Sequence, residues 1–197
     1  MADIKIINNI DGFAEVCEVL HRSQKAESEA TGVLFNTIRL SAEELEREIE
    51  DHKGRCVGVF ENGRIIGTLC AFEDNKNRWY THNKKSLEIK YVAVSPESQG
   101  KHVGSAMLDY VKSFDNYEIL NVSTGEKNKN AIHFYNKNGF ILVDISRGPI
   151  HNACKLAYWK EGCLIKQRTI NSHVLKSRFK CFIKKLLRPK ADKKNYQ

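Results

Sequence analysis

The loop at residues 95–105, SPESQGKHVGS, joins a strand-like segment to a helix-like segment and carries Gly100 and Gly104. Glycine lets a backbone turn tightly and approach a ligand closely. At such a turn the first N–H groups of the helix point outward, and the helix dipole adds partial positive charge. The loop is therefore suited to the pyrophosphate of a large nucleotide cofactor, although a tight turn without a ligand also requires glycine.

The segment VAVSPESQGKHVGSAML resembles the acetyl-CoA-binding motif of the GNAT superfamily of N-acetyltransferases, written Gln/Arg-x-x-Gly-x-Gly/Ala. Gln99 and Gly104 match this motif, whereas His102 stands where the family has its middle glycine. Two interpretations of His102 are open: its imidazole contacts phosphate, or it points to solvent. A second segment, NKNAIHFYNKNGF at 128–140, is similar to the later family motif in which Asn-x-x-Ala precedes Phe-Tyr and Gly-Phe.

The resemblance covers residues 55–145 and implies a fold, a cosubstrate and a set of contacts. The implied fold is α/β (α+β mixed sheet), the acyl-CoA N-acyltransferase fold, in which helices flank a twisted mixed sheet with two splayed central parallel strands. Acetyl-CoA is the implied cosubstrate, and no metal is expected. The implied acetyl-CoA contacts are Val92, Ala93, Val94, Gln99, Gly100, Lys101, His102, Val103, Gly104, Ser105, Asn128, Ala131 and Phe134.

Two residues are candidates for proton transfer during acetylation of an amine. The second motif implies that Tyr135 is the general acid that protonates the departing CoA thiolate; the alternative is an ordinary buried tyrosine. Glu88 resembles the strand glutamate that acts as general base in some family members. It shares a strand face with Lys90, Val92 and Val94 if the backbone is regular. A surface pair between Glu88 and Lys90, with a water chain as the base, is equally open.

The other contacts that the resemblance implies use the backbone or a helix end. In the family, the splayed strand offers backbone donors, here at Val92 and Val94, that hold the pantetheine arm and polarise the thioester carbonyl. Asn128 resembles the residue that hydrogen-bonds the cofactor, and it is also a natural N-cap for the next helix. Both roles of Asn128 can hold at once.

A short strand and two helices are expected before the first motif. Residues 4–7 form an apolar run typical of a strand, and Asp11 caps a helical pattern that ends near Lys25. Ser41 and Glu44 form a capping box that begins a second helix. These helices are expected to form a movable flank of the domain.

The rest of the domain reads as alternating strands and helices. Gly54 closes the second helix, and Asn62-Gly63 is the strongest short signal for a β-hairpin because both positions favour positive φ. SLEIKYVAV predicts a strand that stops at Ser95-Pro96 and leads to a helix from near Lys101. Another strand, a helix ended by Gly139 and two final strands follow. This order implies a mixed sheet rather than a doubly wound nucleotide-binding fold.

The net charge of +8 is concentrated near the C-terminal end. From Lys160 onward there are twelve basic and two acidic residues, so residues 1–159 carry a net charge of −2. A body close to neutral gives no sign of nucleic-acid binding. The chain is therefore expected to consist of an N-acetyltransferase domain at 1–160 and a basic tail at 161–197.

Within this tail the spacing predicts an amphipathic helix at 173–188, ended by Pro189. Its apolar stripe consists of Leu175, Phe179, Phe182, Ile183 and Leu186. Two interpretations are open. The stripe makes a peripheral contact with an anionic membrane, or it packs on the protein's own sheet or on a second subunit of a homodimer.

Several classes of protein are disfavoured by composition. The six cysteines form no CxxC pair and the seven histidines no HExxH spacing, which predicts reduced thiols and no zinc site. The first residues, MADIKIINNI, lack the features of a signal peptide, and no apolar run approaches the ~20 residues of a spanning helix. A cytoplasmic protein is expected.

The predicted reaction is acetyl transfer from acetyl-CoA to a primary amine by direct attack in a ternary complex. The acceptor is a small molecule, an amino sugar or a peptide. Its binding site is expected to be shaped by residues 26–40, 75–85 and 147–152, and none of these segments contains a motif that identifies the acceptor. The alternative function is a non-catalytic acyl-CoA-binding or membrane-recruited adaptor.

Overall fold

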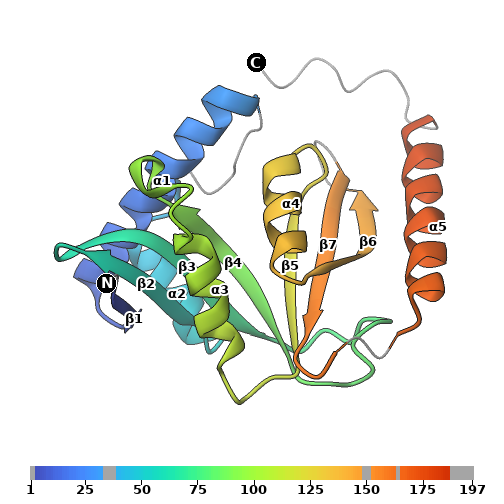
Figure 1. The fold of residues 1–197 in the computed structure, drawn as a ribbon, viewed down its shortest axis with the longest axis horizontal. Helices are drawn as coiled ribbons and strands as arrows, with labels where there is room; N and C mark the ends of the chain where they lie inside the picture. Colours follow the sequence, from blue (N-terminus) through green and yellow to red (C-terminus); the bar gives the residue numbers. More distant parts are fainter. Residues whose placement is uncertain (1–2, 33–38, 148–151, 163–164, 187–197) are drawn as a thin grey trace.

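The described part of the chain forms one seven-stranded mixed sheet in the order β1-β2-β3-β4-β5-β7-β6, flanked by helices (Figure 1). The computed structural model describes residues 3–32, 39–147, 152–162 and 165–186. The strands are β1 (Asp3–Ile7), β2 (Arg55–Glu61), β3 (Arg64–Asp74), β4 (Ser86–Val94), β5 (Ile119–Gly125), β6 (Ile141–Arg147) and β7 (Asn152–Trp159). The helices are α1 (Ile10–Thr31), α2 (Ala42–Asp51), α3 (Val103–Lys112), α4 (Lys129–Lys137) and α5 (Gln167–Leu186), with the 3₁₀ helix η2 (Pro96–Ser98) before α3.

The two central strands, β4 and β5, are parallel and separate along their length. Their pairing runs from Ser86 opposite Ile119 to Ile89 opposite Val122, although β4 continues to Val94. Figure 1 shows the two strands meeting at one end and diverging toward the other. The other strand pairs of the described sheet are antiparallel. The predicted mixed sheet with splayed parallel strands is therefore confirmed.

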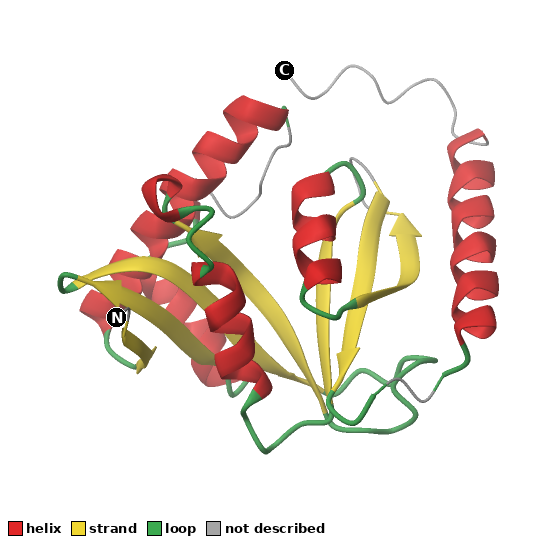
Figure 2. Ribbon diagram, in the orientation of Figure 1, coloured by secondary structure: helices red, strands yellow, loops and turns green. Residues whose placement is uncertain are grey.

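Apolar residues alternate along the strands and build a core on each face of the sheet. On β3, Leu69 and Ala71 pack on the face covered by α3 and α4, whereas Cys70 and Phe72 pack on the face covered by α1 and α2 (Figure 2). This alternation is the pattern of a strand buried on both sides. Helices packed on both faces of the sheet therefore fix the position of the strands that carry the candidate site.

A bulge interrupts β4 at Tyr91. Lys90 pairs with Cys70 on β3, but Ala93 pairs with Thr68, so three steps along β4 match two along β3. Tyr91 has a φ of 54°, in the left-handed region that aromatic residues rarely adopt. One extra residue in a strand reverses the alternation of the side chains that follow it.

The bulge overturns the expectation that Glu88 shares a face with Val92 and Val94. Lys90, two residues after Glu88, donates from Nζ to Glu48 on α2 at 2.6 Å, so this part of β4 faces α1 and α2. Val92 and Val94 instead pack into the core on the α3 face. The prediction of regular alternation was wrong because nothing in the local sequence marks Tyr91 as a bulge.

The first helix begins earlier and ends later than expected. The N-cap is Asn9 rather than Asp11, and the Asn9 side chain accepts a hydrogen bond from the N–H of Gly12 at 2.8 Å. The helix continues past Lys25 until Gly32, whose φ of 67° ends it in the left-handed conformation. Neither glycine nor proline occurs between Lys25 and Gly32, so no local signal stops the helix sooner.

The second helix has the predicted capping box. Ser41 Oγ accepts from the N–H of Glu44 at 3.2 Å, and a Glu44 carboxylate oxygen accepts from the N–H of Ser41 at 3.0 Å. At the other end the N–H of Gly54 donates to the carbonyl of Ile49 at 2.7 Å, but the left-handed residue is Lys53, with a φ of 47°. The predicted hairpin turn is also confirmed, since Asn62 and Gly63 both have positive φ.

Helix α5 packs along β6, the edge strand of the sheet, and begins before the expected start at 173. Its inward face carries Ile170, Val174, Ser177 and Cys181, at helical spacing. The expected end at 188 and Pro189 lie outside the described residues. Among the described residues, no helix combines the length and the apolar character needed to cross a bilayer.

The predicted apolar stripe of this helix points away from the sheet. Leu175, Phe179 and Phe182 keep 69%, 66% and 56% of their surface exposed, and Ile183 is half-buried. The side chain of Leu186 lies outside the described part. The interpretation in which this stripe packs on the protein's own sheet is therefore wrong, because a different face of α5 makes that contact.

Candidate active site

A cavity of about 500 Å³ lies where β4 separates from β5, between the loop at 95–102, α3, α4 and α1. It is lined by Tyr135 and by every residue expected to contact acetyl-CoA except Lys101. The expected residues come from distant parts of the chain: 92–94 from the end of β4, 99–105 from the loop and α3, and 128–135 from α4 and its N-cap. The fold therefore gathers both sequence motifs around one space.

Residues 103–105, at the start of α3, line this cavity and have backbone N–H groups without intrahelical acceptors. The first hydrogen bond within α3 runs from the N–H of Ala106 to the carbonyl of His102 at 3.0 Å, so the N–H groups of residues 103–105 lack intrahelical acceptors. Gly100 has a φ of 77°, which glycine adopts without strain. A helix start with unsatisfied N–H groups and a positive dipole end suits an anionic phosphate group.

His102 is the N-cap of α3 and has a φ of 63°. This is the left-handed region, where a side chain with a Cβ is strained and glycine is not. The resembled motif has glycine at this position, so the departure replaces an unstrained residue with a strained one. The imidazole is exposed at the rim of the cavity.

Gly104 is required by packing rather than by its backbone angle. A Cβ placed on Gly104 would lie 3.0 Å from the ring of Phe134 on α4. Real Cβ atoms rarely approach an aromatic carbon so closely, so a side chain here pushes α3 and α4 apart. The matched motif glycine therefore keeps the two helices close on either side of the cavity.

Helix α4 positions Tyr135 on the cavity wall. The side chain of Asn128 accepts from the N–H of Ala131 at 3.0 Å, which confirms the predicted N-cap. Tyr135 is 5% exposed, and its ring packs edge-on against Phe134 and Phe140. Burial raises the pKa of the Tyr135 phenol above its ordinary value, so the hydroxyl keeps its proton at neutral pH.

The end of β4 offers a free strand edge to the cavity. Because pairing with β5 ends at Ile89, the backbone groups of residues 90–94 that point toward β5 have no partner on that strand. Gln99, which matches the first motif, donates from Nε2 to the carbonyl of Val94 at 3.3 Å and holds the loop against the strand end. The geometry leaves an extended backbone edge beside the cavity, as a pantetheine-like chain requires.

Glu88 lies outside this cavity, on the opposite face of the sheet from Val92 and Val94. Its carboxylate is 3.8 Å from Lys76 Nζ, and its side chain is 19% exposed. The alternative pairing of Glu88 with Lys90 is wrong, because Lys90 bonds to Glu48 instead. Glu88 stands opposite Asn121 in the register of β4 and β5, one pair before the strands part.

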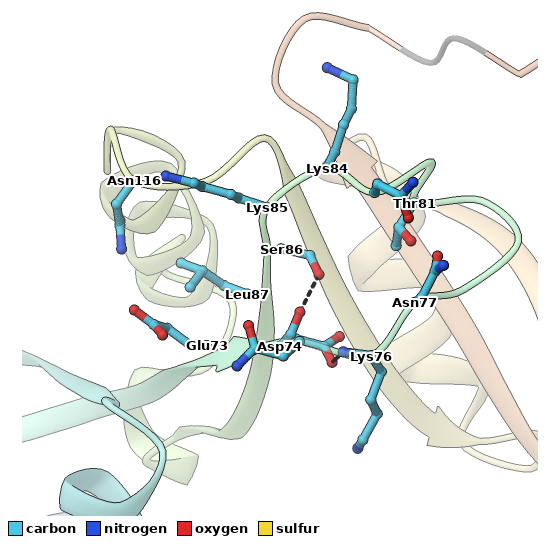
Figure 3. A pocket seen from close by; sticks show the side chains of 12 residues that line it. Glu73, Asp74, Lys76, Asn77, Thr81, Lys84, Lys85, Ser86, Leu87 and Asn116 are labelled. Carbon is cyan, nitrogen blue, oxygen red and sulfur yellow. Dashed lines mark hydrogen bonds between the residues drawn. The ribbon is translucent and has the colours of Figure 1, made fainter.

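A second hollow, also of about 500 Å³, lies at the closed end of the two parallel strands and is shown in Figure 3. The Ser86 hydroxyl donates to the Asp74 carbonyl at 2.8 Å, and the Lys76 N–H donates to the Asp74 carboxylate at 3.2 Å. That carboxylate also accepts from Arg78 and from Asn121. Both oxygens of the Asp74 carboxylate therefore accept hydrogen bonds from the protein.

The cavity also contains residues that sequence reasoning missed. Ser23, Gln24 and Glu27 of α1 line it, together with Asn130 and Lys137 of α4. Glu27 lies beyond the expected helix end near Lys25, whereas Ser23 and Gln24 lie within the expected helix but outside both motifs. Positions 23, 24 and 27 share one side of the helix, but that spacing does not indicate which surface the side faces.

The fold is shared with solved acetyltransferase structures. An N-acetyltransferase from Staphylococcus aureus Mu50 superposes with a TM-score of 0.61 at 18% identity, covering 82% of this chain and 99% of that chain. The PaiA N-acetyltransferase from Thermoplasma acidophilum in complex with coenzyme A gives 0.61 at 19% identity, covering 80% and 99%. A spermidine N-acetyltransferase SpeG chimera from Vibrio cholerae and hSSAT gives 0.61 at 14% identity, covering 84% and 99%.

A sequence model of the acetyltransferase (GNAT) family matches residues 20–140. The matched segment begins in α1, ends just after α4, and contains all the residues of the two motifs that line the cavity. The predicted fold and the resemblance drawn from the motifs are thus both confirmed. The chain belongs to the GNAT family of acetyltransferases.

Proposed function

We propose that the protein transfers the acetyl group of acetyl-CoA to a primary amine by direct attack within a ternary complex. One observation carries the proposal: the free edge of β4, the N-terminus of α3 and the buried Tyr135 converge on a single cavity. The residues of this cavity fit acetyl-CoA, with the N–H groups of 103–105 toward phosphate and the backbone of 92–94 along the pantetheine arm. When bound, acetyl-CoA supplies an acetyl group activated as a thioester.

Tyr135 is the proposed general acid. Its phenol is buried in the wall of the cavity and carries its proton at neutral pH, so a proton is available there for a departing thiolate, while burial makes the phenol a weaker acid than a free tyrosine. The surrounding rings of Phe134 and Phe140 fix its position and exclude water. The Tyr135→Phe variant distinguishes this role from that of a purely structural tyrosine.

The acceptor amine is proposed to approach from the face opposite α3, through the gap between the diverging strands. Glu88 and Asn121 stand side by side one residue pair before this gap opens. The Asn121 amide donates to Asp74 at 3.0 Å, while its buried Oδ1 has no hydrogen-bond partner within the described part of the chain. An amine at this position donates one N–H to Asn121 and loses a proton to Glu88, either directly or through water.

The test has two separate stages. Calorimetric titration of acetyl-CoA and of free CoA measures occupation of the cavity, and thiol release across a panel of amines measures turnover. Micromolar binding together with amine-dependent thiol release is the expected result. Binding without turnover on any amine favours the second candidate, an acyl-CoA-binding adaptor, which the strained His102 in the phosphate loop supports. Absence of binding overturns both functions.

The chemical class of the acceptor is proposed only as a primary amine of a small molecule, amino sugar or peptide. Cytoplasmic residence and a reaction without metal or nucleic acid remain predictions. Fractionation of the native host cell, followed by detection of the protein in soluble and membrane fractions, tests the location directly.

A further inference from the structure

We propose that the outward face of α5 is a docking surface for an anionic lipid membrane. The face consists of Leu175, Phe179 and Phe182, the three most exposed large apolar side chains of the described residues. They occur at i, i+4 and i+7, so they form one stripe along the helix. A contiguous exposed apolar stripe on a soluble domain marks an interaction surface.

The inward face of α5 already accounts for the packing of the helix on the domain. Ile170 is 1% exposed, and the Ser177 hydroxyl donates to the Asp144 carboxylate on β6 at 2.6 Å. Cys181 Sγ donates to the carbonyl of Ile145 at 3.7 Å. The ring of His173 stacks on Trp79, with 4.3 Å between centroids. The stripe on the other side therefore has no role in holding the helix to the sheet.

The charge around the stripe selects its partner. At 100° per residue, Arg178 lies next to the stripe on one side, Lys176 lies on the other side, and Lys180 follows Lys176 farther round the helix; all three are exposed. Residues 162–191 contain nine lysines and arginines and neither aspartate nor glutamate. An apolar stripe bordered by cations matches a membrane whose headgroups are anionic.

A second copy of the chain is a poorer match for the same face. Two α5 stripes in contact bring Lys176, Arg178 and Lys180 of both copies together without an acidic residue on either helix to pair with them. Like charges in a desolvated contact are destabilising. The lipid surface removes this conflict, because it supplies the negative charge that the helix lacks.

The experiment is sedimentation of the full-length protein with phosphatidylcholine vesicles, with and without phosphatidylserine, at low and high salt. The expected result is binding that requires phosphatidylserine and weakens as salt rises. Neutralising one of the α5 cations, as in Lys176→Gln or Lys180→Gln, is expected to reduce the partition coefficient about fivefold. Replacing both aromatic residues, Phe179→Gln with Phe182→Gln, is expected to reduce it more than about tenfold.

Matched controls separate insertion from misfolding and from charge alone. Ile10→Gln removes an exposed apolar side chain on α1, far along the chain from the stripe, and is expected to leave vesicle binding unchanged. Circular dichroism and acetyl-CoA binding establish that each variant is folded. If the aromatic double variant binds phosphatidylserine vesicles as well as wild type, the docking surface is overturned. The same conclusion follows if wild type binds no vesicles, or if the double variant instead converts a dimer to a monomer in sedimentation velocity.

Discussion

Glu48 on α2 is hydrogen-bonded to the hydroxyl of Tyr91, the residue at which β4 adopts its left-handed backbone conformation. The same carboxylate accepts from Lys90 Nζ at 2.6 Å. One side chain of α2 therefore binds two consecutive residues at the bulge. The bulge in turn decides that the side chains of Val92 and Val94, rather than that of Ala93, pack in the core on the α3 face.

Removing the Tyr91 hydroxyl tests whether this contact supports the bulge. Tyr91→Phe is expected to lower the free energy of unfolding by about 1–2 kcal/mol, because a charge-assisted hydrogen bond is lost from a residue held in a strained conformation. Acetyl-CoA binding weakens as well, since the strand edge shifts. Chemical denaturation and calorimetric titration measure the two effects. Tyr110→Phe, on α3, is the matched control. If both variants have the same unfolding free energy and the same acetyl-CoA affinity, the contact with Glu48 does not support the bulge or the site.

Acid stability gives a second test of the same carboxylate. Burial opposes ionisation of Glu48, but the hydrogen bonds from Lys90 and Tyr91 outweigh it and hold the pKa of Glu48 below its ordinary value of 4.5. The unfolded chain then binds the proton more readily than the folded protein does. The stabilisation is therefore complete above pH 4.5 and is lost as pH falls through the folded pKa.

In Glu48→Gln, unfolding stability is expected to be lower at neutral pH and to fall less on acidification than in wild type. Denaturant midpoints between neutral pH and pH below 4.5 measure the difference. Glu50→Gln, an exposed carboxylate on the same helix, is the control and should keep the wild-type profile. A Glu48→Gln profile parallel to wild type would contradict the assignment.

Replacing His102 with the glycine of the family motif is expected to stabilise the protein. His102→Gly removes left-handed strain and raises the free energy of unfolding by up to about 1 kcal/mol. Lys101→Gly, at a neighbouring position without positive φ, is expected to lower it by about 0.5 kcal/mol. Acetyl-CoA affinity decides between the two interpretations of the imidazole. Weaker binding in the more stable variant indicates a phosphate contact, and unchanged or tighter binding indicates a residue that points to solvent.

Tyr135→Phe separates proton donation from packing. The ring contacts with Phe134 and Phe140 are retained, so acetyl-CoA affinity and unfolding stability are expected to change little. The turnover number is expected to fall by about 10²-fold, as for loss of a general acid. Single-turnover thiol release with a saturating amine measures the chemical step. Unchanged turnover would assign Tyr135 a structural role.

Glu88→Gln tests the acceptor side of the sheet. As general base, Glu88 produces a rise of kcat/KM with pH, and the variant is expected to lose this rise while keeping acetyl-CoA affinity. Asn121→Ala is expected to raise KM for the amine more than it lowers kcat, because it removes an acceptor of the amine N–H without removing the base. A wild-type pH profile in Glu88→Gln leaves the base role to water.

Local signals in the sequence predicted local structure well. The capping box at Ser41 and Glu44 and the turn at Asn62-Gly63 depend on neighbouring residues alone, so both were readable before the fold was known. The two motifs also identified 13 of the 19 residues that line the cavity. Side-chain types at those positions are constrained by backbone approach and helix packing, as Gly104 against Phe134 illustrates.

Features that depend on tertiary packing were not readable. The bulge at Tyr91 is stabilised by Glu48, more than forty positions earlier in the chain, so SLEIKYVAV reads as a regular strand. Helix α5 carries apolar residues on two opposite faces, and the sequence alone could not tell which one meets the sheet. Ile170 and Cys181 are smaller than the phenylalanines and lie farther apart in the sequence, yet they form the buried side.

The brief pairing of β4 with β5 also gives the protein a mechanical property. Only four residue pairs, from Ser86–Ile119 to Ile89–Val122, join the two strands within the described sheet, so its halves meet along a short seam. A molecule lying across the open end touches both halves and acts as a brace between them. Amide hydrogen exchange should therefore slow on β4 and α3 and also on β5 and α4 when acetyl-CoA binds, linking the two sides of the seam into one rigid unit.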